Sequence, residues 1–305
     1  MATPSTNGPP RISVVVASKV GAPFVDYCLT SLAEQSRTQN AEIIVVAAGE
    51  SSYAARLAED YPWAQVTHST QATQIPAMRR VGVEAARAPY VAIIEEHCSA
   101  APDWLAKALA ALESGPYGAA GGPIVDHDYR RLRDWVVYFL EYHGALPPAP
   151  QGETTNLNDA NIAYPRQVLV EHLELLNDGY WPMTLHPTLL GKGVKMLSAP
   201  DMIVHHRGPF NFGYYLGQRF LFSRAYAGVR ANTQPATRRF AYIVLAPLVP
   251  FMMLARISSI VLRKGRRIPQ FLATLPLLTV ALVVMVAGEW LGCVAGPGDA
   301  LAKVE

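Results

Sequence analysis

Charged residues are scarce in this chain. They make up 16% of its 305 positions, whereas hydrophobic residues make up 50% and the mean hydropathy is positive. A soluble domain typically carries about 25% charged residues, so the composition indicates a segment that contacts lipid. The formal net charge of +2 is too small to predict a nucleic-acid partner.

Cysteine is also scarce, and Cys28, Cys98 and Cys293 show no paired metal-type or redox-type spacing. This argues against a disulfide framework and favours a reducing compartment. The start of the chain, residues 1–10, is polar and Pro-rich and lacks the apolar core of a signal peptide. We therefore expect these residues to be a flexible lead-in and the domain after them to stay in the cytosol.

No Gly-rich phosphate loop with a lysine occurs near the N-terminus, which argues against a nucleotidyltransferase. Instead, short β-branched runs alternate with helical segments. The expected strands are 11–19, 42–46, 65–69 and 90–94, and the expected helices are 24–35, 53–61 and 75–87. This alternation predicts an α/β fold with a parallel, doubly wound sheet. The loops that follow its strands should meet in one crevice, and they are 17–20, 47–52 and 95–99.

After residue 100 the expected strands and helices no longer alternate regularly. We expect further helices at 103–113, 129–142, 168–176 and 184–193, and further strands at 119–125 and 161–164. The sequence contains no internal repeat.

The end of the chain, residues 236–305, is predicted to be a C-terminal hydrophobic membrane anchor. Residues 268–288 contain no charge and would form a helix about 31 Å long, enough to cross a bilayer. We expect a transmembrane helix over 268–290. The segment 240–262 is either a re-entrant or interfacial hairpin or a first membrane helix, and the basic groups at 238–239 and 263–267 both favour the cytosolic side. A buried helix of the soluble domain is the alternative.

An acidic pair and a histidine, Glu95, Glu96 and His97, directly follow the fourth predicted strand. Two carboxylates and an imidazole at a strand end can hold a hard divalent cation, and the cation can neutralise a diphosphate. A solvated polar cluster is the alternative interpretation of the same three residues.

The order of the motifs resembles that of family 2 glycosyltransferases of the GT-A fold, from about Ile12 over nearly the whole chain. The matching stretches are ISVVVAS, CLTSLAEQS, EIIVV, IPAMRRVGVEAARAPYVAIIEEHC, APDWL, AAGGPI, NDANIAYPR, APDMIVHHR and QRFLFSRAYAGVR. The resemblance implies a Rossmann-like, GT-A-type doubly wound mixed sheet. It also implies a catalytic domain over 11–235, with a nucleotide-binding half at 11–125 and an acceptor half at 126–235.

The resemblance also implies roles for single residues. Glu95, Glu96 and His97 take the place of the family's Asp-x-Asp motif and would hold Mg²⁺ or Mn²⁺ against the diphosphate of a nucleotide sugar. His205 or His206 matches a downstream histidine that joins the metal, and His206 fits the spacing better. The other implied contacts to the nucleotide sugar are Ala17 and Ser18 in the first loop, Arg79 on a helix facing the crevice, and Asn161 in the sugar and acceptor region.

Three further residues belong to a stretch, 218–224, that loosely resembles the family's Gln-x-x-Arg-Trp region, although the Trp is absent. Gln218, Arg219 and Arg224 are therefore expected to contact the nucleotide sugar. An amphipathic helix at a membrane surface accounts for the same stretch equally well, and both can hold if the active site opens at the bilayer.

The sequence departs from the family pattern at two places. After the second strand the usual base-binding acid is missing, and Glu50 would have to replace it from further along the loop. Pro182 occupies the place of the acid that takes the acceptor's proton, which leaves Asp178, His186 and Asp159 as candidate catalytic bases.

The resemblance and the anchor together predict an enzyme at the cytoplasmic face of the cell membrane. It would move a sugar from a nucleotide-diphosphate donor to a lipid-linked or membrane-proximal acceptor, by a metal-assisted and inverting reaction. The alternative is a catalytically altered or inactive GT-A-fold protein that acts as a membrane-bound binding or scaffolding module.

Overall fold

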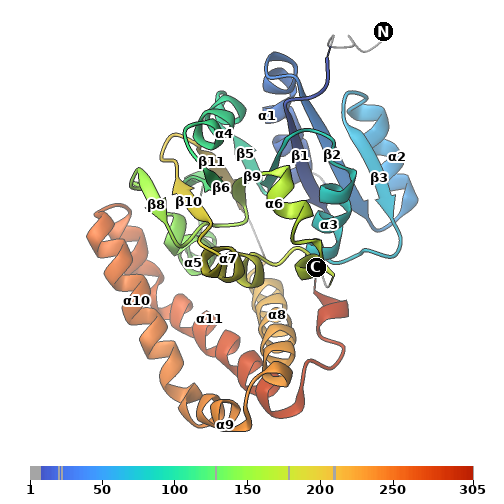
Figure 1. Cartoon of the computed structure of the whole chain (residues 1–305). Coiled ribbons are helices and arrows are strands. Elements are labelled where there is room, and N and C mark those ends of the chain that lie inside the picture. Colours follow the sequence, from blue (N-terminus) through green and yellow to red (C-terminus); the bar gives the residue numbers. More distant parts are fainter. Residues whose placement is uncertain are drawn as a thin grey trace. The chain divides into compact units, whose positions relative to one another are not determined.

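A computed structural model describes residues 8–19, 21, 23–127, 129–177, 179–208 and 211–304 (Figure 1). The chain divides into two compact units. Unit 1 comprises Met1–His127 and Gly144–Arg207, and unit 2 comprises Asp128–His143 and Gly208–Glu305.

Unit 1 is built on an eight-stranded sheet with the order β3-β2-β1-β4-β9-β6-β10-β8. The bounds of its strands in chain order are β1 (Ile12–Ser18), β2 (Ala41–Ala48), β3 (Gln65–Ser69), β4 (Tyr90–Ile94), β6 (Tyr117–Gly121), β8 (Gly152–Thr154), β9 (Asn161–Pro165) and β10 (Lys195–Ser198). The neighbours β3, β2, β1 and β4 are parallel, while β9 is antiparallel to both β4 and β6. The expected α/β fold with a mixed sheet is therefore confirmed.

A second sheet of three strands has the order β5-β11-β7. Its strands are β5 (Cys98–Ala100), β7 (Ile124–His127) and β11 (Val204–Arg207), and β11 brings residues from late in the chain beside the segment that follows β4. Two of these strands, β5 and β11, were not expected from the sequence.

Helices cover the eight-stranded sheet. They are α1 (Phe24–Thr38), α2 (Ser51–Asp60), α3 (Ile75–Ala85), α4 (Trp104–Glu113), α6 (Arg166–Val170) and α7 (Pro182–Gly191), with short 3-10 helices at His143–Ala145 and Leu173–Leu176. Every residue of β1 is buried, as the absence of polar alternation predicted. Gly82 lets α3 approach β1 closely, because a Cβ at that position would lie 2.3 Å from Cγ1 of Val15.

Two predicted elements are each divided in the structure. The strand expected at 119–125 is two strands, β6 and β7, which belong to different sheets. The chain turns between them at Gly122, where a Cβ would lie 1.9 Å from the carbonyl oxygen of Met202. The helix expected at 168–176 is likewise divided into α6 and a 3-10 helix.

Unit 2 is helical in the residues that the structure describes. Its helices are α5 (Leu132–Tyr142), α8 (Phe212–Thr233), α9 (Ala236–Leu245), α10 (Val249–Lys264) and α11 (Ile268–Ala295), with 3-10 helices at Ala246–Leu248 and Leu301–Lys303. Two helical runs, Ala236–Lys264 and Ile268–Ala295, are long and apolar enough to cross a membrane by length and composition. The segment 268–290, expected as a transmembrane helix, is helical as part of α11, and its crossing of a membrane stays a prediction.

Candidate functional site

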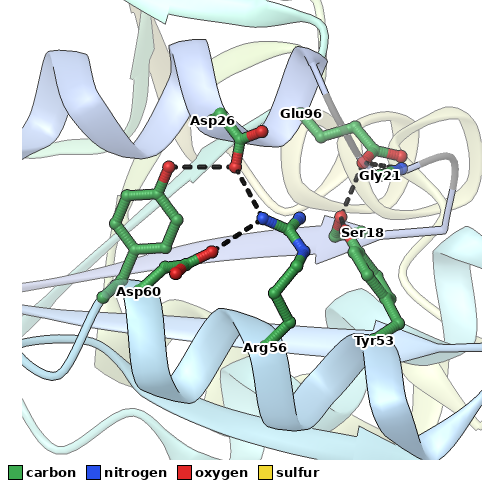
Figure 2. Close-up of polar contacts among 8 residues, drawn as sticks. Ser18, Gly21, Asp26, Tyr53, Arg56, Asp60 and Glu96 are labelled. Carbon is green, nitrogen blue, oxygen red and sulfur yellow. Dashed lines mark hydrogen bonds and ion pairs between the residues drawn. The ribbon is translucent and has the colours of Figure 1, made fainter.

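The loop after β1 is held by the carboxylate of Glu96. The Ser18 hydroxyl donates to Glu96 Oε2 at 2.6 Å, the Lys19 amide donates to Oε1 at 3.0 Å, and the Gly21 amide donates to Oε2 at 3.3 Å. Figure 2 shows Glu96 above Ser18 and beside Gly21. The predicted meeting of the loops after β1 and β4 is therefore confirmed, and Glu96 is the residue that joins them.

Tyr53 of α2 brings the loop after β2 to the same place. Its hydroxyl forms a hydrogen bond with the Ser18 hydroxyl, and burial raises the Tyr53 pKa to about 12. The sequence interpretation missed Tyr53. Its position directly after the loop 47–52, which was expected to enter the crevice, is the signal that would have identified it.

An ion-pair network fixes α2 against α1 beside this loop (Figure 2). Arg56 of α2 bridges Asp26 of α1 at 3.4 Å and Asp60 at 2.8 Å, and the Tyr61 hydroxyl donates to Asp26 at 2.9 Å. The network is partly exposed, so each pair adds only a little to stability. Its effect is to set the position of the helix that carries Tyr53.

The other two residues of the acidic motif lie together. Glu95 Oε1 and His97 Nδ1 are 3.6 Å apart, and the rings of His97 and His206 have centroids 6.2 Å apart. Burial raises the Glu95 pKa, but the contact with His97 and the charges of His206 and Arg79 outweigh it and lower the value to about 2. Glu95 is therefore an ionised, largely buried carboxylate.

The pKa values of the two histidines shift in opposite directions. Burial lowers the His97 pKa, but the close contact with Glu95 and the charges of Glu95 and Glu96 raise it overall. Burial lowers the His206 pKa to about 3, which keeps that imidazole neutral at physiological pH. A neutral imidazole is the form that binds a metal.

The side chains that could act as metal ligands suit a cation that takes its remaining ligands from a substrate. In the described residues, no three His, Cys, Asp or Glu side chains are grouped closely enough to hold a metal ion by themselves. Mg²⁺ commonly binds to one or two carboxylates and completes its coordination with waters and substrate phosphates. Ionised Glu95 beside His97 and neutral His206 fits such a partial site.

A buried arginine lies between this cluster and the acceptor half. Arg79 of α3 has 7% of its side chain exposed and forms an ion pair with Asp159, whose side chain is 39% exposed. Burial lowers the Arg79 pKa, but the charges of Asp159 and Glu95 raise it overall, so the guanidinium stays charged. The Nε atom of Arg79 is buried and has no hydrogen-bond partner among the residues that the structure describes.

Three buried side chains form a polar chain in the acceptor half. The Tyr164 hydroxyl is 2.6 Å from both the Tyr180 hydroxyl and His186 Nε2. Burial lowers the His186 pKa to about 4. Because His186 is only 6% exposed and is bonded to Tyr164, it is a less accessible base than Asp159. The third base candidate, Asp178, lies outside the described residues, and Pro182 begins α7.

The predicted contact of Asn161 with a sugar disagrees with its surroundings. Asn161 is fully buried, and its side chain accepts from Trp104 Nε1 at 2.7 Å and donates to the carbonyl oxygens of Pro123 and Met202 at 3.1 and 2.7 Å. The amide therefore joins three chain segments and is buried among them. Ala17 is buried in β1, and the Glu50 carboxylate is exposed before α2, where it accepts from Ser52.

The three expected contacts from the stretch 218–224 lie on α8 in unit 2. Arg219 forms an ion pair with Glu141, Gln218 donates to the carbonyl oxygen of Lys303 at 3.4 Å, and Arg224 donates to that of Gly296 at 3.4 Å. Each of these side chains thus has a contact within the helical unit. Their role toward a nucleotide sugar stays a prediction.

Comparisons with known proteins agree with this geometry. The model of "Glycosyl transferase family 2" matches residues 13–173, while no curated protein sequence matches the chain. Among solved structures, the mannosyltransferase PcManGT from Pyrobaculum calidifontis, in complex with GDP-Man and Mn²⁺, is 18% identical with a TM-score of 0.55, over 93% of this chain and 88% of that one. TarS 1–349 from S. aureus in complex with UDP-GlcNAc is 16% identical with a TM-score of 0.52, over 92% and 89%. These likenesses show the fold.

Proposed function

Because the chain belongs to glycosyl transferase family 2, we propose that it transfers a hexosyl group from a nucleotide-diphosphate sugar to a lipid-linked or membrane-proximal acceptor. The observation that supports this most is the cluster of Glu95, His97 and His206 beside Arg79, at the carboxyl ends of the central strands. Ligands of open α/β sheets bind at that edge.

We assign the donor diphosphate to this cluster. Glu95, His97 and His206 would hold Mg²⁺ or Mn²⁺, and the cation, when bound, would neutralise the phosphate charge and stabilise the departing diphosphate. The buried Arg79 guanidinium would add a positive charge on the same side. The loop that Glu96 holds through Ser18, Lys19 and Gly21 would receive the nucleoside, with Glu50 as the exposed acid nearest the base.

For the transfer step we propose Asp159 as the base, in the place that Pro182 leaves open. Its carboxylate is partly exposed and oriented by Arg79. It would take the proton of the acceptor hydroxyl while the acceptor oxygen bonds to the anomeric carbon and the bond from that carbon to the diphosphate breaks. This direct displacement inverts the configuration at the anomeric carbon.

The C-terminal helices support a lipid-linked or membrane-proximal acceptor. Two helical runs have the length and composition of membrane segments, and the basic groups at 238–239 and 263–267 favour the cytoplasmic face. An enzyme attached there meets acceptors at the membrane surface.

The test is binding of a panel of nucleoside diphosphates and their sugars to the detergent-purified chain, with and without Mn²⁺, followed by a transfer assay. We expect metal-dependent binding of one nucleotide that is lost in His97→Ala and kept in His143→Ala, a histidine outside the site. Asp159→Asn should keep the binding and lose the transfer. Absence of binding to every nucleotide would contradict the proposal.

A second candidate function is a catalytically altered module that binds or scaffolds at the membrane. It rests on one observation: Pro182, which begins α7, replaces the expected acid. Nucleotide binding without any transfer, and without an effect of Asp159→Asn, would favour this module over the enzyme.

A further inference from the structure

Charge is divided very unevenly along the chain. Residues 1–201 contain 14 Lys and Arg against 21 Asp and Glu, whereas residues 202–305 contain 12 against 3. Between Met202 and Gly288 there are 11 Lys and Arg and no acidic residue at all. The C-terminal part is thus complementary to an anionic surface, although the whole chain is nearly neutral.

One face of α11 is exposed along the whole helix and is entirely apolar. We call it the α11 stripe. Its members recur every three or four residues, which places them on a single face. They are Pro269, Leu272, Ala273, Pro276, Val280, Val283, Ala287, Trp290, Val294 and Ala295. Large apolar surfaces left in contact with water are rare in monomers and mark a partner.

The opposite face of α11 is covered by protein. A Cβ on Gly288 would lie 2.3 Å from the carbonyl oxygen of Phe220, and one on Gly292 would lie 2.3 Å from that of Arg224, so α8 packs directly on this Gly-x-x-x-Gly segment. Toward the other end of α11, the ring of Phe271 lies against Phe139 of α5 with centroids 5.2 Å apart.

The helices that cover α11 carry charges. Within unit 2, α8 has Arg219, Arg224 and Arg230, and Arg219 is paired with Glu141 of α5. If α11 crossed the bilayer, these ionised groups would enter the hydrocarbon region beside it, where they are strongly disfavoured. A helix that lies flat, with one face in lipid and the other on protein, avoids this.

The helical run from α9 to α10 also exposes apolar side chains. Its most exposed apolar side chains are Phe240, Phe251 and Met252, each 68 or 69% exposed. Exposed basic residues lie at the far end of this run, at the α10–α11 turn, among them Arg263 and Arg266. An apolar face with a basic margin is the pattern of a helix in the interface of an anionic membrane.

We propose that α9, α10 and α11 lie in the plane of one anionic leaflet and contact it through the α11 stripe and the exposed face of α9 and α10, without crossing the bilayer. This rests on the membrane attachment in the proposed function. It differs from the crossing helix that the sequence predicted at 268–290.

Topology is tested with single cysteines in the full chain, expressed in cells and studied in inside-out membrane vesicles with a membrane-impermeant maleimide. Glu59→Cys reports the side of unit 1, Arg266→Cys the turn between α10 and α11, and Lys303→Cys the end of the chain. The unmodified chain gives the background, because its three cysteines are buried.

We expect all three cysteines to react before the vesicles are opened. Protection of Arg266→Cys alone would reveal a two-helix hairpin across the bilayer, and protection of Lys303→Cys alone would reveal a crossing α11. Either result overturns the in-plane arrangement and keeps the membrane attachment. A chain that remains soluble without membranes overturns both.

The lipid contact is tested by binding of the purified chain to vesicles of phosphatidylcholine, with and without phosphatidylglycerol. Binding should be stronger with phosphatidylglycerol, and Arg263→Ala should weaken it about fivefold. Val283→Lys, on the α11 stripe, should weaken binding tenfold or more, while Val170→Lys, an exposed valine of α6, should not. If Val283→Lys instead turned a dimer into a monomer and left vesicle binding unchanged, the stripe would bind a second copy and the proposal would be wrong.

Discussion

Replacing Glu96 by Gln should release the loop that follows β1. The carboxylate accepts from Ser18 and Gly21 on one oxygen and from the Lys19 amide on the other. A glutamine keeps one of the two acceptor oxygens and replaces the other by an NH₂ group. That NH₂ group faces a donor and cannot accept a hydrogen bond from it. One charge-assisted bond, worth about 1.5–3 kcal/mol, is lost, and the other two fall to neutral strength at about 1 kcal/mol each. The expected total is about 2.5–7 kcal/mol, made up of about 1.5–3 kcal/mol from the lost bond and about 0.5–2 kcal/mol from each weakened bond.

Amide hydrogen exchange measures this loss of local stability directly, because the Lys19 and Gly21 amides donate two of the three hydrogen bonds to Glu96. Their exchange should accelerate by about two to five orders of magnitude in Glu96→Gln, because each 1.4 kcal/mol of lost local stability is a factor of ten. Glu50→Gln is the matched control: its exposed carboxylate accepts from Ser52, and the rates at Lys19 and Gly21 should not change. Rates in Glu96→Gln within threefold of the unmodified chain would refute the assignment of Glu96 as the residue that holds the loop.

Three further substitutions test the surroundings of the site. Asn161→Ala should lower the free energy of unfolding by about 3 kcal/mol or more, measured by urea denaturation, because it removes three buried hydrogen bonds; a loss below about 1 kcal/mol would contradict this. Gly82→Ala should cost about 1–3 kcal/mol in the same measurement through overlap with Val15, whereas Gly191→Ala, with no atom within 4 Å, should be nearly neutral. His186 has its pKa lowered to about 4, so the unfolded chain binds its proton first and stability falls as the pH drops from about 6.5 toward 4. That pH slope should be smaller in His186→Gln, and an unchanged slope would assign it to other groups.

The long buried strands could be predicted from the sequence, and the short ones could not. The buried run that became β4 was located to the residue, because apolar or β-branched segments of this length, bounded by turn residues, are typical of strands in a parallel sheet. The strands β5 and β11 are three and four residues long, and β11 reads Val-His-His-Arg. Only pairing with β5 and β7, which lie far away in the chain, makes such a polar segment a strand.

In the site, too, some features could be predicted from the sequence and others could not. Glu95, Glu96, His97 and His206 were predicted together as metal ligands, because strand ends and motif order are visible in the sequence. The structure brings Glu95, His97 and His206 together, while the Glu96 carboxylate accepts from the loop after β1. The role of Glu96 depends on where the Ser18 loop folds back, which no local pattern encodes. Asn161 was assigned to the sugar and acceptor region because it matches a family position, whereas here tertiary contacts bury it completely.

The pairing of β11 with β5 also has a consequence for biosynthesis. His206 stands opposite Cys98 and His205 opposite Ser99, so a slip of one residue would replace His206 by its neighbour on the face toward His97. The correct register joins segments separated by more than 100 residues, and contacts that distant form late in folding. On the ribosome the first half of unit 1 is complete long before residue 206 emerges. The nascent chain therefore cannot assemble the predicted cation site until translation has passed β11. An incompletely synthesised chain thus cannot act on the donor.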